Sequence, residues 1–525
     1  MSKPQPSRRQ LLKGAGAIAI GRLTGDRRDP ASASASSTRQ TRDEGQGAAD
    51  DPPRRRPNVL FIIDDQHRFD VLGAAGDKMA HTPALDGLAS RGLRFTDVYC
   101  QVPLCVPARQ SLLTATYAHQ HTTFGNVVQE YPEDQATLAG HLRKHGYQTA
   151  MIGKSHFNHH EFEVVYEKGT MARKFDRRHP QGVHPGSHAM KSQLDDFPMP
   201  LRSANPHYLP ASKDAEQAVF RMEEEVVARS RTFLDERDSE RPFFLWASLV
   251  SPHPPRFPPK QWLDQYRDAD VPLPAALTQA SYDALFSFHR ALITSSGMSR
   301  ISRDQLRNLV RAYYASVAWS DYNIGLLLAE LEARGLTKDT LVVYTSDHGE
   351  ALGEHGLMGK VTFFEGPQRV PLILSHPDLI GAASVSQRVV THLDLMTSLP
   401  GLLQIPAFDP AQGRSLMPLL KPSKTSSWED VAIAELYLGE KNFEQVPGSH
   451  LSVMLRQRDL KYVEGIIGEA ALFDLASDPH ETRDLIKDVG RKGDLEEILD
   501  RVHEHKPEQF YARVTRVPQR LNKPK

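Results

Sequence analysis

Short runs of branched and aromatic residues alternate along the chain with longer segments in which apolar residues recur at helical spacing. The runs at 59–63, 243–249 and 341–346 are apolar at most positions, which is typical of strands buried on both faces of a parallel sheet. Between residues 311 and 335 the apolar positions follow helical spacing instead. This alternation predicts an α/β fold with a doubly wound, mostly parallel sheet flanked by helices over residues 58–420.

The pattern changes toward the C-terminal end. There the apolar runs become short and are separated by turn-forming residues, which favours a small antiparallel sheet. The runs lie at 431–437, 451–455, 460–466 and 472–475. We therefore predict a smaller C-terminal antiparallel-sheet subdomain with a terminal helix over residues 421–525.

The N-terminal region is predicted to be a targeting signal rather than part of the fold. Residues 7–13 (Ser-Arg-Arg-Gln-Leu-Leu-Lys) resemble a twin-arginine export signal and precede a weakly apolar stretch at 14–21. We predict a signal peptide at 1–35 and a disordered linker, rich in charge, Pro, Gly and Ala, at 36–57. This implies passage through the twin-arginine translocase to a periplasmic or secreted location. The alternative is a basic N-terminal arm that binds nucleic acid.

Composition narrows the function classes. The chain has 525 residues, a formal net charge of −1 and a hydrophobic content of 39%, enough for a substantial core. The balanced charge gives no electrostatic footprint for nucleic acid or for an anionic membrane surface. No stretch approaches the ~18 apolar residues needed to span a bilayer. We expect neither a nucleic-acid partner nor a membrane span.

Acidic and imidazole side chains follow two of the predicted buried strands. Asp64 and Asp65 end the first strand, and Asp347 and His348 follow the strand at 341–346. Ligands gather at the carboxyl ends of strands in open α/β sheets, so these residues indicate a divalent metal site. Acidic residues at the end of a single strand can also be simply solvated. Because a second strand ends in further potential ligands, the metal site is the favoured interpretation.

The chain contains two cysteines, Cys100 and Cys105. Their even number leaves open a small disulfide loop if the protein is exported. Residues 105–109 (Cys-Val-Pro-Ala-Arg) also resemble the Cys-x-Pro-x-Arg signature of type I sulfatases, in the alkaline phosphatase superfamily. In those enzymes a formylglycine-generating enzyme oxidises the cysteine to an aldehyde. Its hydrate has two hydroxyls on one carbon, one to attack sulfur and one to expel the sulfate.

The resemblance covers nearly everything after the linker and extends to the metal-binding pattern. It implies that Asp64, Asp65, Asp347 and His348 hold one divalent cation that also touches the formylglycine made from Cys105. Many sulfatases have Asn where this chain has His348. The resemblance implies Ca²⁺. Because imidazole is a softer ligand than an amide oxygen, Mn²⁺ and Mg²⁺ stay open as alternatives.

Three further segments are similar to sulfatase motifs. Gly-Lys-Ser-His at 153–156 follows a predicted strand, and alternate strand residues point the same way, which aims Lys154 and His156 into one cavity. The alternative interpretation is that this Gly-Lys-Ser-His segment is an exposed basic edge of the sheet. Pro-His-Pro-Pro at 252–255 matches a Pro-His-x-Pro motif, although a lone histidine is more often structural. Lys360 resembles the second sulfate-binding lysine.

The resemblance also implies catalytic roles. Lys154, Lys360 and the metal would stabilise negative charge that develops around the sulfuryl group. His253, helped by Lys360, would protonate the leaving oxygen. Arg109 would orient and activate the hydrate, and His156 would take a proton from its second hydroxyl.

Three functions remain open from the sequence. The leading one is an exported sulfatase that hydrolyses a small-molecule or glycan sulfate monoester, with a sulfated sugar, a choline-like ester or a phenol as the released alcohol. The second is a phosphonate monoester or phosphodiester hydrolase of the same superfamily. The third is a noncatalytic exported binding protein that keeps an unmodified thiol.

Overall fold

The computed structural model describes residues 55–126, 135–157, 161–166, 213–254, 256, 258–421, 427–438, 450–465 and 469–505. These residues belong to one compact unit, Arg55–Lys525. The predicted signal peptide and all but the last three residues of the predicted linker lie outside the described residues. Among the described helices, none is both long and apolar enough to cross a membrane.

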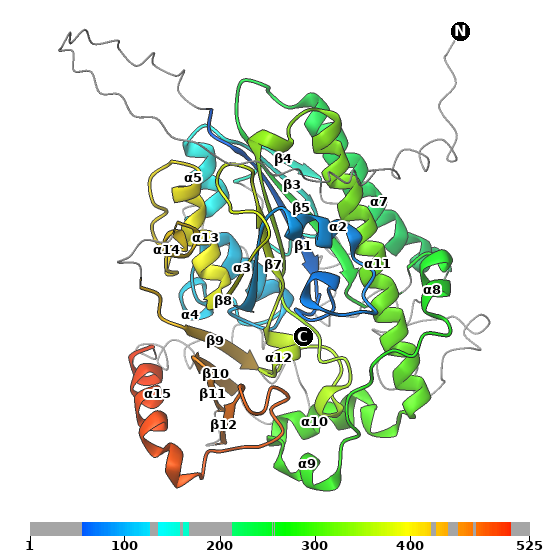
Figure 1. Ribbon diagram of the computed structural model, residues 1–525, viewed down its shortest axis with the longest axis vertical. Coiled ribbons are helices and arrows are strands. Elements are labelled where there is room, and N and C mark those ends of the chain that lie inside the picture. The colour runs from blue at the N-terminus through cyan, green and yellow to red at the C-terminus, as the bar shows by residue number, and fades with distance from the viewer. Residues whose placement is uncertain are drawn as a thin grey trace, which may run out of the picture. The chain divides into compact units, whose positions relative to one another are not determined.

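The main sheet has eight strands in the order β4-β3-β5-β1-β6-β7-β2-β8 (Figure 1). They are β1 Asn58–Asp65, β2 Leu93–Tyr99, β3 Gln148–Gly153, β4 Val164–Tyr166, β5 Phe243–Pro252, β6 Thr340–Ser346, β7 Leu372–Ser375 and β8 Ser384–Thr391. The central strand β1 pairs in parallel with β5 and β6. Only β7 runs antiparallel to its neighbours, β6 and β2, so the predicted mostly parallel sheet is confirmed.

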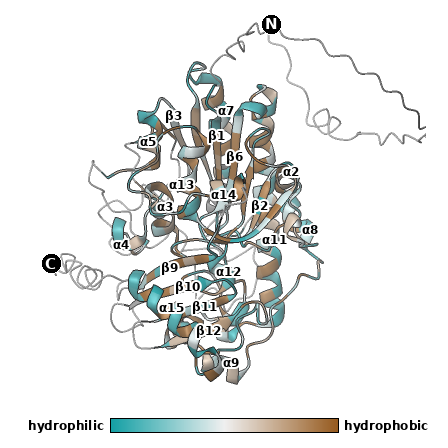
Figure 2. Cartoon of the chain, turned by 60° about the vertical axis from the view of Figure 1, so that its left-hand side comes forward, coloured by the Kyte–Doolittle hydropathy of each residue, from teal (hydrophilic) through white to brown (hydrophobic). Residues whose placement is uncertain are grey.

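Helices cover both faces of this sheet because side chains alternate along its strands. On β1, Leu60 and Ile62 pack in one core with α2, α7 and α11, whereas Phe61 and Ile63 pack in another with α3, α5 and α13. Figure 2 shows the central strands in hydrophobic colours between these layers. The helix bounds are α2 Pro83–Ser90, α3 Cys105–Thr114, α5 Leu138–Lys144, α7 Lys213–Glu236, α11 Arg303–Ala333 and α13 His392–Leu402. The doubly wound arrangement is confirmed.

The long helix begins earlier than the sequence analysis predicts. The sequence predicts it from residue 311, but α11 begins at Arg303 behind a capping box formed by Ser302 and Gln305. These two side chains satisfy the free backbone N–H groups of the first turn. The capping box marks the start of α11, and the buried Leu306, Leu309 and Val310 show that its apolar face also extends back before residue 311. The shorter helices are α4 Ala118–His121, α8 Lys260–Tyr266, α9 Gln279–Ala284, α10 Ser287–Ser296, α12 Glu365–Gln368 and α14 Met417–Leu420.

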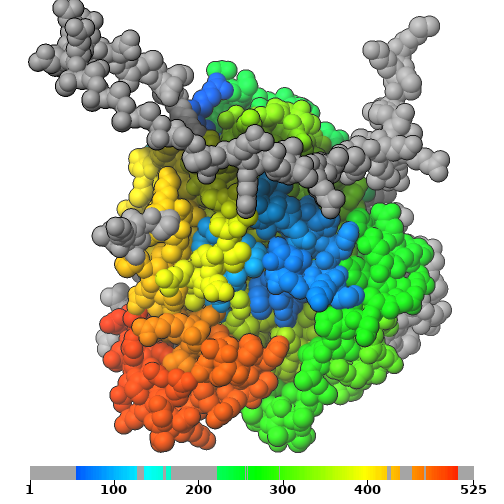
Figure 3. All heavy atoms as spheres, in the orientation of Figure 1, coloured from blue at the N-terminus to red at the C-terminus, as the bar shows by residue number. Residues whose placement is uncertain are grey.

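The C-terminal residues form the second sheet that the sequence predicts. Its strands are β9 Val431–Leu438, β10 His450–Gln457, β11 Leu460–Glu464 and β12 Ala470–Asp474, and they pair antiparallel in the order β12-β11-β10-β9. The terminal helix α15, Lys492–His505, packs Ile498 and Val502 against this sheet. In Figure 3 the orange and red atoms of these elements occupy one continuous part of the surface. The domain boundary at residues 420 and 421 stays a prediction.

Buried charges join the two sheets. Lys461 on β11 is completely buried, and its Nζ lies 2.9 Å from Glu365 Oε1 and 2.7 Å from Glu481 Oε1. Tyr99 at the end of β2 donates its hydroxyl to the same Glu365 carboxylate. Buried ionic groups need partners of this kind, because a charge left unpaired in a low-dielectric interior is strongly unfavourable.

Gly153, at the end of β3, offers a test of how closely the strands approach one another. Its φ is 103°, and a Cβ at this position would lie 2.0 Å from the Ser248 carbonyl oxygen on β5. Gly146 has a similar φ of 92° but nothing within 4 Å of the same added atom. A left-handed backbone costs an L-residue about 1–2 kcal/mol, so Gly146→Ala should lose roughly that amount. We expect Gly153→Ala to lose clearly more free energy of unfolding, measured by denaturant titration. Equal losses would show that the approach of β5 does not constrain Gly153.

Candidate active site

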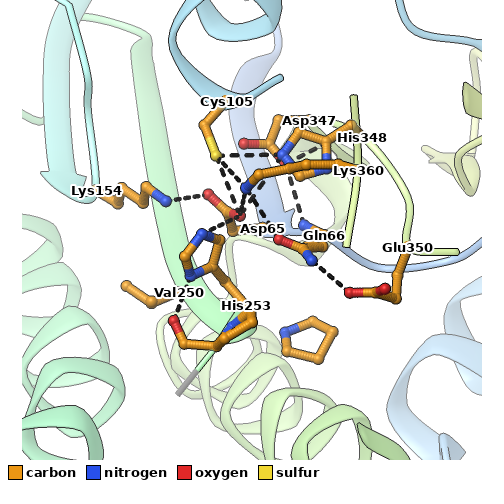
Figure 4. A network of polar contacts seen from close by, with 12 residues as sticks. Asp65, Gln66, Cys105, Lys154, Val250, His253, Asp347, His348, Glu350 and Lys360 are labelled. Carbon is orange, nitrogen blue, oxygen red and sulfur yellow. Dashed lines mark hydrogen bonds and ion pairs between the residues drawn. The ribbon is translucent and has the colours of Figure 1, made fainter. Parts of the chain in front are cut away.

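The carboxyl ends of β1, β3, β5 and β6 lie next to one another in the main sheet, and the predicted site residues collect at this edge (Figure 4). Asp65 ends β1, and Asp347 and His348 follow β6. Lys154 follows β3, and His253 follows β5. The sheet order therefore brings together residues that are far apart in the sequence, as expected for an open α/β sheet.

Four buried side chains form a group that could hold a metal ion. Asp65, Cys105, Asp347 and His348 each offer a ligand atom, and these atoms lie within 4.8 Å of one another. The Cys105 Sγ is 3.2 Å from His348 Nε2 and 3.7 Å from Asp65 Oδ1. Two carboxylates and an imidazole are suitable ligands for a divalent cation of hard or borderline character.

The hydrogen bond of His348 fixes which ring nitrogen faces this group. Its Nδ1 lies 2.9 Å from the Gly349 carbonyl oxygen, which can only accept, so Nδ1 carries the proton. Burial lowers the pKa of His348 to about 4, so the ring is neutral near physiological pH. The Nε2 lone pair is therefore available to a cation, as in other metal sites where a carbonyl orients the ligating histidine.

The electrostatics of the two carboxylates also fit a cation. Burial and the nearby charge of Asp65 raise the pKa of Asp347. For Asp65, burial alone would raise the pKa, but Lys154, His253 and Lys360 hold it well below its usual range. A divalent cation between the carboxylates would relieve their repulsion and favour ionisation of both.

Asp64 is not brought into this group. Its carboxylate accepts hydrogen bonds from the Ser320 hydroxyl at 2.7 Å and the Tyr344 hydroxyl at 2.9 Å, and lies 3.0 Å from His67 Nδ1. In this structure the Asp64 carboxylate faces Ser320, Tyr344 and His67, whereas the Asp65 carboxylate faces Cys105 and His348. The group of potential ligands thus contains Asp65 and not Asp64, and the expected role of Asp64 as a ligand stays a prediction.

Arg109 connects the metal-binding group to the neighbouring strands. It is completely buried, and its Nε donates to Asp347 Oδ2 at 2.8 Å while Nη2 donates to Asp65 Oδ2 at 3.2 Å. Nη1 donates to the Lys154 carbonyl oxygen at 2.8 Å and to the Ser248 hydroxyl at 2.7 Å. The planar fork of arginine suits such multiple contacts. Arg109 positions both carboxylates, while its expected action on the formylglycine hydrate stays a prediction.

Two lysines bring positive charge to the same place. Lys360 Nζ lies 2.6 Å from Cys105 Sγ and donates to Gln66 Oε1 at 2.9 Å. Burial alone would lower the pKa of Lys360, but Cys105 and Asp65 raise it, which keeps the ammonium protonated. Lys154 Nζ forms a buried ion pair with Asp65. Both predicted lysines thus lie beside the metal-binding group.

His253 approaches the group from the loop after β5. Its Nδ1 lies 2.5 Å from the Pro254 carbonyl oxygen, so Nδ1 is the donor and Nε2 faces Asp65 Oδ1 at 3.9 Å. Burial, Lys360 and Lys154 hold the pKa of His253 well below its usual range. The free ring is therefore neutral, and it can act as an acid only after it gains a proton at Nε2.

His156 reaches the site by a different route from the one that the sequence predicts. β3 ends at Gly153, and His156 lies in the following loop with a φ of 61°, so strand alternation does not aim it. It is buried, and neither ring nitrogen has a hydrogen-bond partner among the described residues. Burial and the charges of Lys154 and Arg109 lower its pKa well below the usual value. A neutral, unpartnered imidazole of this kind can accept a proton.

Sequence reasoning missed a second layer of polar residues. Gln66, with a φ of 73°, donates its backbone N–H to Asp347 Oδ1 at 3.1 Å and its side-chain amide to Glu350. Glu350 is buried and also pairs with Arg256. Adjacency was the available signal, because Gln66 follows Asp65 directly and Glu350 lies just beyond the Asp-His-Gly segment. Supporting residues of this kind orient the side chains that bind a metal directly, and they are often as important to a site as those ligands.

The disulfide alternative is not formed in the structure. Cys100 and Cys105 are both free and buried. Cys105 instead begins α3 and points toward His348 and Lys360 (Figure 4).

Comparisons with known proteins agree with this geometry. A family model described as Sulfatase matches residues 57–405, and one described as N-sulphoglucosamine sulphohydrolase, C-terminal, matches residues 353–508. An arylsulfatase of Clostridium perfringens is 30% identical over 446 residues, which cover 82% of this chain and 90% of that protein. A choline-sulfatase of Rhizobium meliloti is 28% identical over 444 residues, 82% of each chain.

Solved structures show the same fold. The phosphonate monoester hydrolase of Agrobacterium radiobacter is 25% identical with a TM-score of 0.69, covering 86% of this chain and 96% of that one. A protein solved in complex with its substrate D-glucosamine-2-N,6-O-disulfate is 22% identical with a TM-score of 0.67, covering 87% of this chain and 99% of that one.

The different surroundings of the adjacent acids give a direct test of the metal-binding group. We expect Asp65→Asn to lower the content of bound divalent cation and the catalytic rate together, because Asp65 belongs to the group of candidate ligands. Asp64→Asn should keep near-normal metal content and instead lower thermal stability, because it alters buried hydrogen bonds to Ser320 and Tyr344. Elemental analysis after equilibration with Ca²⁺ measures the first effect and thermal unfolding the second. Equal metal loss in both variants would contradict the placement of Asp64.

Proposed function

The chain belongs to the sulfatase family and is a sulfuric ester hydrolase, and from this premise we propose that it is an exported, formylglycine-dependent sulfatase with one bound Ca²⁺ ion. The observation that carries the proposal is the surroundings of Cys105. Its Sγ lies 2.6 Å from Lys360 Nζ and 3.2 Å from His348 Nε2, within a buried group of potential metal ligands. An oxidised side chain at this position would lie beside both a cation site and a fixed ammonium group.

The proposed ligands of the ion are Asp65, Asp347, His348 and the modified residue 105. When present, formylglycine supplies the attacking hydroxyl and the ion supplies positive charge for the sulfuryl oxygens. The protein's own contribution is to hold these groups in place, and Arg109 does so by fixing both carboxylates. Sites arranged in advance of the reaction stabilise developing charge without reorganisation.

The cationic side chains bind and orient the ester. Lys154 and Lys360 lie on either side of Asp65, with Lys360 Nζ 4.0 Å from Asp65 Oδ1, and would hold the sulfuryl oxygens. Arrival of an anion beside His253 favours the protonated ring, which then donates from Nε2 to the departing oxygen. His156, buried and unpartnered among the described residues, is the base that takes a proton from residue 105 in the second half of the reaction.

An acid at His253 supports a basic leaving group, such as a sugar or a small alkyl alcohol. Phenolates leave with little help, whereas alkoxides need a proton. Among the similar proteins, one is a choline-sulfatase, and another was solved with its substrate D-glucosamine-2-N,6-O-disulfate. Both names indicate sulfates of a small alcohol or a sugar. We infer that the substrate is a sulfate monoester of a carbohydrate or a small alcohol.

Export is supported by the sequence at residues 7–13 and 14–21. We propose passage through the twin-arginine translocase to the periplasm or beyond. That route transports folded proteins, which places the action of a formylglycine-generating enzyme in the cytoplasm before transport.

Phosphonate monoester hydrolysis is a second candidate activity. It is favoured by the likeness to the Agrobacterium radiobacter enzyme. The same cationic groups would bind a phosphonate monoanion, so geometry alone favours neither ester strongly.

Modification of Cys105 and preference for sulfate can be tested on one preparation. We expect peptide mass spectrometry to find an aldehyde at position 105, and kcat/KM for nitrophenyl sulfate to exceed that for a nitrophenyl phosphonate ester. Cys105→Ala should fold normally and lose turnover of both esters, because the nucleophile is absent. A fully active protein with a free thiol at position 105 would refute the nucleophile. A higher kcat/KM for the phosphonate would select the second candidate.

The acid role of His253 predicts a dependence on the leaving group. His253→Ala should lower the rate with an alkyl sulfate by roughly 10²–10⁴-fold, the usual effect of losing a general acid, and the rate with nitrophenyl sulfate by much less. Both rates are corrected for the fraction of residue 105 converted to aldehyde. Lys154→Ala is the matched comparison, since loss of sulfuryl binding should affect both esters alike. The same loss for both esters in His253→Ala would argue for binding rather than proton transfer.

A further inference from the structure

A second group of potential metal ligands joins three elements from different parts of the chain. His119 lies on α4, Glu435 on β9, and His505 at the end of α15. Each offers one ligand atom within 4.8 Å of the others, in a group separate from the one around Cys105. Neither the catalytic roles nor the sulfatase motifs use these residues.

The three side chains converge on one carboxylate oxygen. His119 Nδ1 lies 2.6 Å from Glu435 Oε1, and His505 Nε2 lies 2.8 Å from the same oxygen. The other oxygen, Oε2, accepts the backbone N–H of His119 at 3.1 Å. A carboxylate only accepts, so each imidazole must present a proton to Oε1 when no ion is bound. When a metal ion binds these two nitrogens, each neutral imidazole carries its proton on its other ring nitrogen instead.

Burial adds to the suitability of the group. The Glu435 side chain is 4% exposed, and those of His119 and His505 are each 10% exposed. The centroid of the Tyr117 ring lies 4.5 Å from that of His505 and 5.9 Å from that of His119. This packing restricts both imidazoles. The remaining exposure of the two histidines leaves room for water as a further ligand.

We propose that His119, Glu435 and His505 form a structural binding site for Zn²⁺, with water completing the coordination. Two imidazoles and one carboxylate are a common ligand set for this ion, and borderline nitrogen ligands select it over Ca²⁺. Bonds of about 2.0–2.1 Å in tetrahedral geometry separate ligand atoms by roughly 3.3 Å, so the side chains need to open only slightly. The ion ties the terminal helix to β9 and to α4 of the catalytic domain.

The competing explanation is a hydrogen-bonded histidine–glutamate–histidine cluster that needs no ion. Both explanations predict that the cluster stabilises α15 against the rest of the protein. They differ in whether added Zn²⁺ changes stability, because an ion that binds only the folded protein raises its melting temperature.

The experiment measures Zn²⁺ binding to the full-length protein in excess Ca²⁺, which occupies the catalytic group. Equilibrium dialysis with elemental analysis should find one more Zn²⁺ per chain in the wild type than in His505→Gln. Zn²⁺ should raise the melting temperature of the wild type and leave that of His505→Gln unchanged. Loss of a ligand should weaken affinity by more than the roughly 10–100-fold typical of losing a supporting partner.

His503→Gln is the matched control, since His503 lies on the same helix and is exposed. It should keep both the additional ion and the shift in melting temperature. Co²⁺ provides a spectroscopic check, because the difference spectrum between wild type and His505→Gln should show the absorption of a tetrahedral site. Equal Zn²⁺ content in wild type and His505→Gln, or no effect of Zn²⁺ on melting, would overturn the proposal and leave the cluster as hydrogen bonds alone.

Discussion

The buried ion pairs of Arg109 are the interaction on which the rest of the site depends. One guanidinium holds Asp65 and Asp347, which come from neighbouring strands, and also reaches the backbone after β3 and a hydroxyl on β5. Without it, two carboxylates would face each other in a dry interior, where like charges repel strongly. Because Arg109 lies on the same helix as Cys105, it also fixes that helix relative to the sheet edge.

The arrangement of charge explains why the site favours an anionic ester. Arg109 is fully engaged with the protein, so the positive charge available to a ligand comes from Lys154, Lys360 and a cation. The side-chain amide of Gln66 donates a hydrogen bond to Glu350, and its oxygen accepts one from the Lys360 ammonium. These contacts fix the position of Lys360. The result is a rigid, desolvated positive surface, in which electrostatic interactions are much stronger than in water.

Much of the fold and site could be predicted from the sequence because both follow from strands buried on two faces and polar residues at their ends. The apolar runs located β1, β5 and β6, and the motifs that follow them located Asp65, His253 and Asp347. Side-chain direction was harder. Adjacent acids at 64 and 65 look equivalent in a sequence, but in the structure Asp64 contacts Ser320 and Asp65 joins the group around Cys105. His156 depends on a loop with positive φ, and the role of Gln66 depends on contacts with residues nearly 300 positions away, which no local pattern encodes.

Cys105 is 1% exposed in the folded protein, at the start of a helix whose residues are all buried. A modifying enzyme needs access to the thiol and its neighbours, and the finished fold gives none. If residue 105 is oxidised as proposed, the reaction therefore has to take place before the chain folds around it. Under the same proposal, a chain that folds first would keep its thiol. A cell that synthesises the protein faster than it oxidises residue 105 would then accumulate well-folded molecules without activity.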